Sequence, residues 1–543
     1  MTATQIITVK HTGSEPVPGE RRVSTIRLEA IDSQSRGSEN NGGHSSEHHE
    51  QPVNNISQLR STVIVFQMCG NTMLSSIING LVTVGLPTIT KDLNLPPSLP
   101  FWPVSVSGLS TASTLLLAGS LADVVGPRWV DLVGTFASGA LMLGMGFVQE
   151  GTQLVAMRAI QGVGLALHLV SAVGIATQVF PQGKGRNMAF ACLGMSQPLG
   201  FCLGLVLGGV FVDTIGWRFG WYISGSVALL LSVIGLWALP ASQHPKRWET
   251  ILHDLKFKID WVGALLASAF MALLCYLLAI LSSDIYRIKE TASIVILCLA
   301  AVALPAFVIW IHYQVQRGRP ALIPNSFWKN ATFSSICATI ALSFAVINSM
   351  ELFASLFFQE IQQLSALQAS IRILPSLVVG VLVQVTAGFF VHRVPAIWIV
   401  VLTAVLCSLS PMLMATAQPS WPYWTNTFVA QLLQPVNCNA LFTVGLIIIT
   451  DIFPEDTKAL AGAVFNTAAQ FGTALGFAIL QVISTVITDK NLQGSEITQE
   501  SEIKARLAGY RASFWTMFAF MILCTAISGL GLRRAGRIGL KRD

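Results

Sequence analysis

The sequence consists largely of long apolar stretches, each about as long as a helix that crosses a lipid bilayer. Fourteen such blocks follow one another after residue 60, separated by polar connections. An α-helix rises about 1.5 Å per residue, so roughly 20 apolar residues cross about 30 Å of hydrocarbon. Only 11% of the residues are charged, against about 25% in a soluble domain. The chain is therefore predicted to be an all-α polytopic membrane protein.

The blocks fall into groups of six, two and six, which define the expected domain organisation. We expect a polar, disordered tail at 1–60 and a six-helix bundle at 61–240. Connectors with two inserted helices are expected at 241–330, a second six-helix bundle at 331–533 and a short basic tail at 534–543. The spans are predicted at 62–90, 99–120, 130–148, 153–180, 188–212, 219–239, 259–281, 291–313, 331–358, 367–391, 396–416, 424–452, 459–487 and 512–532.

The distribution of Lys and Arg predicts the orientation of the spans, because basic residues are retained on the cytoplasmic side. The even-numbered connections and the C-terminal tail contain 17 basic residues, and the odd-numbered connections contain eight. We therefore expect both termini in the cytoplasm. The formal net charge of +6 is small and dispersed, so nucleic acid is not an expected partner.

A glycine-rich turn with an acid and a base joins the second and third predicted spans. Asp123 is expected to cap the following helix and to pair with Arg128. The segment resembles the signature of the major facilitator superfamily, G-x-L-x-D-R-x-G-R-R, although Val124 and Pro127 replace two usual basic residues. The matching positions are Gly119, Leu121, Asp123, Gly126 and Arg128. This resemblance implies a major-facilitator-like fold with 14 transmembrane helices, in which the turn acts as a conformational latch at the cytoplasmic gate.

The fourth predicted span contains a basic residue, which is unusual inside a membrane. Arg158, Gln161, Gly162 and Gly164 match the R-x-x-Q-G-x-G element of the same superfamily. A guanidinium in a span costs a few kcal/mol and normally faces the bundle interior or a wet cavity. The alternative is that Arg158 extends to the outer membrane interface. Arg372 is the other basic residue within or at the margin of a span.

Glycines recur at helical spacing in the fifth predicted span, and glycines four residues apart allow another helix to pack with its backbone close. The run resembles the antiporter element G-x-x-x-G-P-x-x-G-G, with Leu205 in the place of the proline. Its glycines are Gly200, Gly204, Gly208 and Gly209. The resemblance is to the fourteen-span drug:proton antiporter branch, especially its fungal members, and it implies export.

The superfamily fold implies that spans one, four, nine and twelve line a central cavity. Amides there would suit an uncharged or zwitterionic organic molecule, or would simply hold helices together. The polar side chains inside these spans are Gln67, Asn71, Arg158, Gln161 and His168 in the first half, and Asn348, Glu351, Gln431, Gln434, Asn437 and Asn439 in the second half.

Glu351 is the sharpest candidate for a proton carrier. It is preceded by some twenty largely apolar residues, and a carboxyl group in such surroundings is costly to ionise. The alternative is a carboxylate at the membrane interface near the outer end of a long span. His168 is a candidate titrating partner or else a hydrogen-bonded residue of the bundle, and Arg158 with Gln161 would couple protonation to the cavity.

Motifs for nucleotide hydrolysis, zinc peptidases and serine hydrolases are absent from the sequence. We therefore expect no enzyme activity, cofactor or metal, and a transporter driven by an ion or solute gradient. The predicted function is proton-coupled export of a small organic molecule, such as a drug, toxin or secondary metabolite. The expected protein is a monomer in the plasma membrane, with the vacuolar membrane as the alternative location. An importer of a nutrient or siderophore, or a sensor on a transporter scaffold, are the other functions considered.

Overall fold

Helices make up nearly all of the described chain. The computed structural model describes residues 57–95, 101–180, 184–240, 248–281, 285–319, 321–390, 394–493 and 498–533, and these residues form no strand. The expected all-α fold is confirmed. The predicted tails at 1–60 and 534–543 lie almost entirely outside the described residues.

The helices follow the order of the predicted spans. The first helix group, as we call α1 to α6, comprises α1 (Gln58–Asp92), α2 (Trp102–Val125), α3 (Pro127–Met145), α4 (Gly151–Val179), α5 (Lys184–Asp213) and α6 (Arg218–Ala238). Between the groups lie α7 (Trp248–Lys258), α8 (Trp261–Leu281), η1 (Ile285–Lys289), α9 (Thr291–Gln316) and η2 (Phe327–Lys329). The second helix group comprises α10 (Ala331–Leu356), η3 (Phe357–Ile361), α11 (Ala366–Phe390), α12 (Ala396–Thr416), α13 (Thr427–Leu433), α14 (Val436–Ile452), α15 (Glu455–Leu492) and α16 (Gln499–Gly531).

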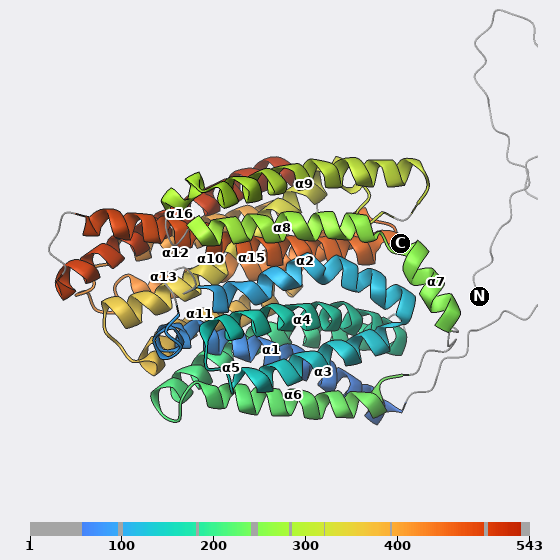
Figure 1. Ribbon diagram of the computed structural model, residues 1–543, viewed down its shortest axis with the longest axis horizontal. Helices are drawn as coiled ribbons and strands as arrows, with labels where there is room; N and C mark the ends of the chain where they lie inside the picture. Colours follow the sequence, from blue (N-terminus) through green and yellow to red (C-terminus); the bar gives the residue numbers. More distant parts are fainter. Residues whose placement is uncertain are drawn as a thin grey trace, which may run out of the picture. The chain divides into compact units, whose positions relative to one another are not determined.

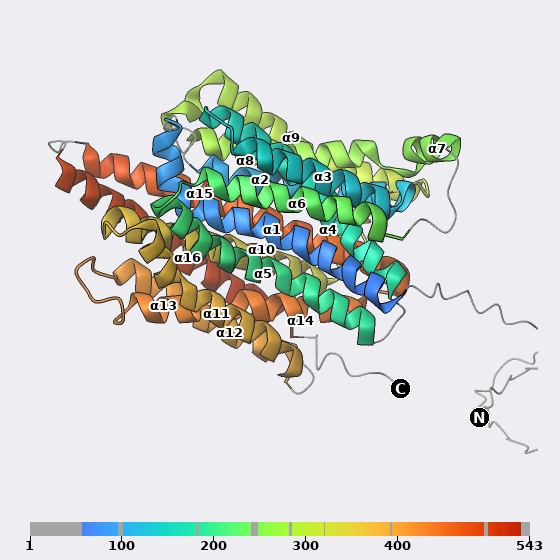
Figure 2. The same ribbon diagram turned by 90° about the horizontal axis from the view of Figure 1, so that it is seen from below.

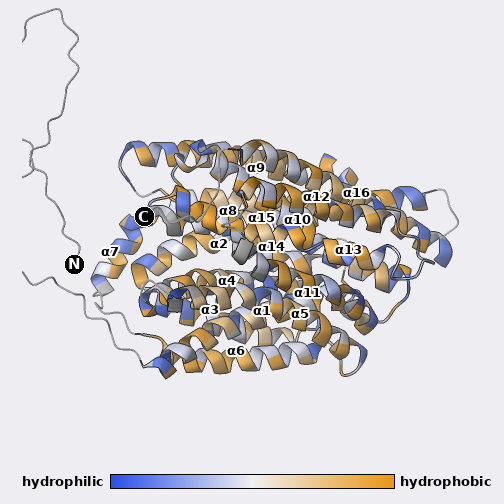
Figure 3. Ribbon diagram, turned by 180° about the vertical axis from the view of Figure 1, so that it is seen from behind, coloured by the Kyte–Doolittle hydropathy of each residue, from blue (hydrophilic) through white to orange (hydrophobic). Residues whose placement is uncertain are grey.

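Thirteen helices of the described residues are long and apolar enough to cross a membrane. The remaining predicted span corresponds to α3, which has Arg128 and Asp131 in its first turns. Hydrophobic residues run along the lengths of the helices and hydrophilic residues gather near their ends (Figure 3). This distribution is the one expected for helices whose middle sections contact hydrocarbon.

The two helix groups are packed in the same way. In the first group α1 packs against α5 and α6, and α3 packs against α6. In the second group α10 packs against α15 and α16, and α12 packs against α16. The groups meet where α2 lies against α15 and where α5 lies against α11. These two contacts are equivalent if α1 to α6 correspond in order to the six spans of the second group.

The inserted pair α8 and α9 forms a hairpin beside the junction of the groups, where α8 packs against α2 and α15. Figures 1 and 2 show α9 on the outer side of α8, with α7 at one end of the helix bundle. The helix α7 falls in a segment for which the sequence predicted only a charged connector. It carries both charged and apolar residues, and it is too short to cross a membrane.

Two spans of the second group are interrupted. The predicted span 424–452 consists of α13 and α14, which are separated at Gln434 and Pro435, because proline removes a backbone donor and disrupts the helix. The end of the ninth span, η3, is a short π-helix. Such irregular turns frequently accompany functional sites.

Candidate functional site

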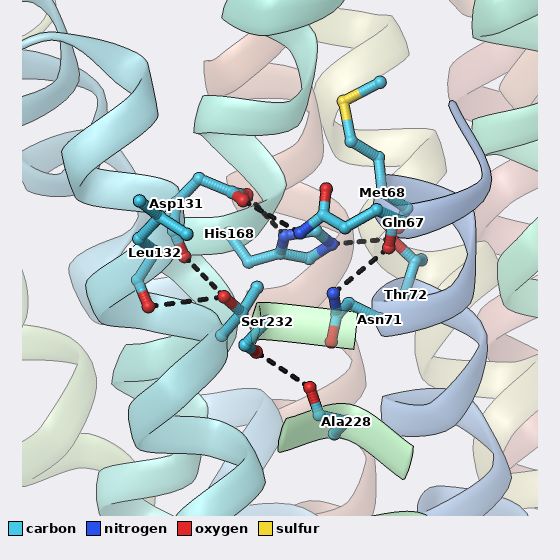
Figure 4. A network of polar contacts seen from close by, with 10 residues as sticks. Gln67, Met68, Asn71, Thr72, Asp131, Leu132, His168, Ala228 and Ser232 are labelled. Carbon is cyan, nitrogen blue, oxygen red and sulfur yellow. Dashed lines mark hydrogen bonds and ion pairs between the residues drawn. The ribbon is translucent and has the colours of Figure 1, made fainter. Parts of the chain in front are cut away.

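A cluster of buried polar side chains joins α1, α3 and α4. The carboxylate of Asp131 on α3 contacts the Nδ1 atom of His168 on α4 at 2.7 Å. The other carboxylate oxygen of Asp131 accepts a hydrogen bond from Gln67 Nε2 on α1 at 3.2 Å. His168 Nε2 lies 3.0 Å from the hydroxyl of Thr72, also on α1. Figure 4 shows His168 between the acid and α1, so three helices are connected through one imidazole.

Water is almost entirely excluded from this cluster. The exposed fraction is 0% for Asp131 and Gln67 and 2% for His168. A small cavity beside the imidazole is lined by Asn71, Ser75, Thr135, Ser138, Met142, Leu165, His168 and Ala228, with space on the order of one water molecule. The cluster is therefore an ionisable site inside the first helix group rather than at its surface.

Asp131 was missed by the sequence interpretation, although the sequence contains a signal for it. It is the second residue of the predicted span 130–148, and a carboxylate within a span is rare and usually functional. Of the residues predicted to line a cavity, Gln67 and Asn71 do lie together, and Asn71 donates to the Gln67 carbonyl at 3.1 Å.

Arg158 is held inside the first helix group by oxygen atoms from three places. Its guanidinium donates to the carbonyl of Pro103 at 2.9 Å, to Asn79 Oδ1 at 2.9 Å and to Gln161 Oε1 at 3.1 Å. It also lies 5.6 Å from the centre of the Trp221 ring. The side chain is only 1% exposed, so the alternative that it extends to the membrane interface is wrong.

Replacing Arg158 with lysine is expected to destabilise the protein although the charge is kept. A lysine nitrogen cannot reproduce the fork that reaches three acceptors, and each buried acceptor left unpaired costs about 1–3 kcal/mol. We expect a lower midpoint of thermal unfolding in detergent for Arg158→Lys. The half-exposed Arg218, which pairs with Asp92, provides the control, because exposed ion pairs contribute only about 0–1 kcal/mol. Equal midpoints for the two lysine variants would contradict this role.

Glu351 on α10 is buried where the two helix groups meet. Its exposed fraction is 5%, so the carboxyl group is enclosed by protein. Gln434 is its side-chain hydrogen-bond partner. Cys202 on α5 and Cys438 on α14 are close enough to interact with its charge. Within the described residues no basic side chain forms an ion pair with Glu351, so its protonation is not fixed by a neighbouring cation.

The amides of the second helix group are buried, and part of their hydrogen-bonding capacity is unused. Asn437 donates to Ser343 at 2.7 Å and accepts from Thr403 at 3.1 Å. Gln434 donates to a backbone carbonyl on α10, but its Oε1 atom has no partner in the described residues. Neither polar atom of Gln431 has one. Asn437 therefore holds helices together, whereas both polar atoms of Gln431 and the Oε1 atom of Gln434 have no partner in the described residues.

Asn348, another amide of the predicted cavity set, is half-buried. Asn348 on α10 donates to Thr473 on α15 at 3.2 Å and to a backbone carbonyl of its own helix at 3.0 Å. It thus connects two packed helices. The sequence-predicted amides therefore divide into structural contacts and unpartnered groups, which their residue type alone could not reveal.

The turn between α2 and α3 differs from its predicted geometry. Gly126 has φ +104°, and α3 begins at Pro127 with no side-chain cap. Arg128 donates to the carbonyl of Leu236 at the end of α6, at 2.8 Å. The expected capping by Asp123 and its pairing with Arg128 are therefore wrong. The physical reason is that α6 offers Arg128 the unpaired carbonyls of a helix end, which attract cations.

The glycines of α5 seat this helix directly on α1. A Cβ atom at Gly200 would overlap the backbone of Met73, at Gly204 that of Ile77, and at Gly208 that of Leu81. Gly209 faces the other helix group, where a Cβ atom would meet the α11 backbone at 2.8 Å. The absence of side chains thus allows the close helix packing that the sequence predicted, and Leu205 in the proline position leaves α5 helical.

The hydrogen bonds between the described residues of the two helix groups occur at one end of the bundle, which we call the Asp92 end because α1 ends there. Gln359 donates to the carbonyl of Val84 at 2.9 Å. The backbone amide of Leu367 donates to Asp213 at 3.0 Å. The hydroxyl of Ser370 donates to a carbonyl of α5 at 2.8 Å. These three hydrogen bonds join α1 and α5 to η3 and α11, and hold the groups together at this end.

Arg372, a cation of the second helix group, contacts neighbouring residues of that group at the same end of the bundle. Arg372 donates to Gln362 at 2.5 Å and lies 5.5 Å and 5.4 Å from the rings of Phe358 and Tyr423. The Tyr423 hydroxyl donates to the carbonyl of Arg372 at 2.7 Å. Burial raises the pKa of Tyr423 to about 12, although Arg372 opposes this shift. The hydroxyl therefore keeps its proton and remains a donor at neutral pH.

Comparison with known sequences shows extensive similarity to membrane transporters. The model of the Major Facilitator Superfamily matches residues 68–429 and 374–539. An MFS-type transporter 1 of Pyricularia oryzae is 37% identical over 526 residues, which cover 89% of this chain and 85% of that protein. The Efflux pump terJ of Aspergillus terreus is 21% identical and covers 82% of this chain and 83% of its own. The Puromycin resistance protein pur8 of Streptomyces alboniger is 24% identical and covers 82% and 86%.

Solved structures share the arrangement of helices. A bacterial homolog of the human lysosomal transporter Spinster, in an inward-facing and unoccupied conformation, superposes with a TM-score of 0.61. The alignment covers 88% of this chain and 98% of that chain at 15% sequence identity. At this identity the likeness establishes the fold alone.

Proposed function

Because this chain belongs to the major facilitator superfamily, we propose that it exports a small organic molecule from the cytoplasm in exchange for protons. The multi-pass membrane fold of a transporter is established by the family membership. Direction is supported by similarity to proteins named as an efflux pump and a resistance protein, and by the glycine element of α5. The proposed location is the plasma membrane, with both termini in the cytoplasm.

The proposed mechanism is alternating access between two six-helix bundles, 61–240 and 331–533, separated by the inserted pair α8 and α9. The matching packing of the helix groups supports this division, since equivalent repeats are what rocking transporters use. The hydrogen bonds at the Asp92 end would break as the bundles rock and open that end. In this cycle the turn from Gly119 to Arg128 is the latch at the opposite, cytoplasmic end.

The observation that best supports proton coupling is the position of Glu351. It is a buried carboxyl group without a cationic partner, at the junction where the bundles move. In the proposed cycle Glu351 binds a proton when the Asp92 end is open and releases it when the cytoplasmic end is open. Gln431 and Gln434 would bind polar groups of the cargo, because both polar atoms of Gln431 and the Oε1 atom of Gln434 are buried and have no partner in the described residues.

Proton flux measured in liposomes tests this function directly. Purified protein is reconstituted in liposomes that contain a pH-sensitive dye, and a proton gradient is imposed. Puromycin is the first probe because a relative is named for resistance to it, and further uncharged and zwitterionic organic compounds form the panel. We expect at least one compound to move against its gradient while protons move the other way. Compound and protons moving in the same direction would identify an importer, and no flux with any compound would favour a sensor.

A further inference from the structure

We propose that Asp131 and His168 form a second proton-binding site of the transport cycle, within the first helix group and separate from Glu351. This inference rests on the proposed function, which it deepens by assigning a further ligand site. The imidazole and the carboxylate are 2.7 Å apart, and both are at least 98% buried. Their partners come from a third helix, α1, so the site joins three helices of one bundle.

The charges around the pair indicate why it should hold a proton. The described residues that face it are uncharged: Gln67, Asn71 and Thr72 from α1, Thr135 from α3, Ser171 from α4, and Ala228 and Ser232 from α6. On α2 the only charged residue is Asp123, which is exposed at the helix end. On α3 the nearest charge is Arg128, one turn before Asp131, and its guanidinium donates to α6. No described cation therefore compensates Asp131 except His168 itself.

A count of protons gives the two states of the site. With one shared proton, the pair is either imidazolium with carboxylate or imidazole with carboxylic acid, and both forms have no net charge. Loss of this proton leaves a net charge of −1 in a buried site, which is costly without a partner. The proton belongs to the pair rather than to one residue. It can leave readily only when a conformational change brings water to the site.

The direction of the hydrogen bonds of Thr72 depends on whether the pair holds its shared proton. We call the pair loaded when it holds this proton and unloaded when it has lost it. Its hydroxyl lies 3.1 Å from the Met68 carbonyl and 3.0 Å from His168 Nε2, but a hydroxyl has only one proton to donate. If Thr72 donates to Met68, then Nε2 must carry a proton and donate to Thr72. Nδ1 and Asp131 then share a further proton, so the pair is loaded. If Thr72 donates to Nε2 instead, Nδ1 donates to Asp131 and the pair is unloaded.

The small cavity beside His168 offers a route for the proton. It has space on the order of one water molecule and is bordered by polar side chains, including Asn71 and Ser138. The Ser138 hydroxyl, which lines the cavity, has no hydrogen-bond partner in the described residues and is free to bind that water. The proposed step moves one proton from water to the pair on one side of the membrane and from the pair to water on the other. No other bond forms or breaks.

Potentiometric titration of the purified full-length protein in detergent tests the site without any cargo. The double variant Asp131→Asn with His168→Gln keeps polar groups of similar size but cannot titrate. Between about pH 4 and pH 9, where carboxyl and imidazole groups exchange protons, we expect the double variant to bind one proton fewer than the wild type. Ser171→Ala, a buried and uncharged neighbour on α4, should match the wild type. The same difference of one bound proton should be found when both proteins also carry Glu351→Gln.

Two results would overturn the proposal. The first is a double variant that binds as many protons as the wild type but unfolds at lower temperature, which would make the pair a structural cross-link between helices. The second is that the one-proton difference between the double variant and the wild type disappears when both also carry Glu351→Gln. This result would mean that Glu351 and the Asp131 and His168 pair form a single site. Failure of the liposome experiment with an intact titration difference would instead remove the proposed export function and leave the proton site in place.

Discussion

Glu351→Gln is expected to reduce cargo-dependent proton movement in liposomes strongly, leaving at most the proton that the Asp131 and His168 pair carries. Glutamine has nearly the same size and can still contact Gln434, but it cannot bind and release a proton at neutral pH. The buried position of Glu351 at the junction of the helix groups means that no solvent-exposed carboxylate can take its place. Exchange of cargo for cargo across the membrane should persist, because that reaction needs no proton release.

The matched control for this experiment is Glu360→Gln. Glu360 lies nine residues further along the chain, in η3, but it already pairs with Arg506 at 2.6 Å and accepts from Tyr510 at 2.5 Å. A carboxylate that already has a cation and a hydroxyl as partners is a poor proton carrier. We expect Glu360→Gln to retain coupled proton movement. If Glu351→Gln retained it as well, Glu351 could not be the carrier.

Gly204→Leu is expected to prevent the protein from folding normally. A Cβ atom at this position would already overlap the backbone of Ile77 on α1, and backbone cannot move aside as a side chain can. Over-packing a well-packed core costs about 1–3 kcal/mol and occasionally more, and here the helices themselves would have to separate. The expected result is a severe loss of monodisperse protein in size-exclusion chromatography, with Gly204→Ala showing a smaller loss.

Gly462→Leu provides the control for this substitution. Gly462 also lies within a long helix, α15, but nothing lies within 4 Å of the position that its Cβ atom would occupy. Leucine is a better helix former than glycine, so we expect wild-type yield and thermal stability for this variant. A normal yield for Gly204→Leu would show that α1 and α5 can separate without loss of the fold, contrary to their close packing.

Hydropathy predicted the membrane-embedded part of each helix but not the parts that extend beyond it. The predicted span 396–416 coincides with α12, whereas α16 begins at Gln499 instead of residue 512. The added turns are polar and are stabilised by a capping box at Thr498 and by the ion pair of Lys504 with Glu500. Such turns have no apolar signal, so only capping chemistry could have indicated them.

Side-chain partners were predicted less well, because neighbours along the chain are not always neighbours in space. Asp123 and Arg128 are close in sequence, yet Arg128 instead contacts the end of α6. Asp131 and His168 are separated by 36 residues, and their contact depends on how α3 packs against α4. The sequence identified His168, Arg158 and Glu351 as unusual, but the partners that define their chemistry follow from packing.

The hydrogen bonds that join the helix groups at the Asp92 end each use a main-chain atom of one partner. Gln359 and Ser370 donate to main-chain carbonyls of α1 and α5, and Asp213 accepts from the main-chain amide of Leu367. Because every residue supplies a carbonyl, side chains at the accepting positions can vary during evolution while the acceptor remains. Selection is thus concentrated on three donor or acceptor side chains, and homologous transporters could diverge widely on the opposing surfaces while they conserve the same closed arrangement.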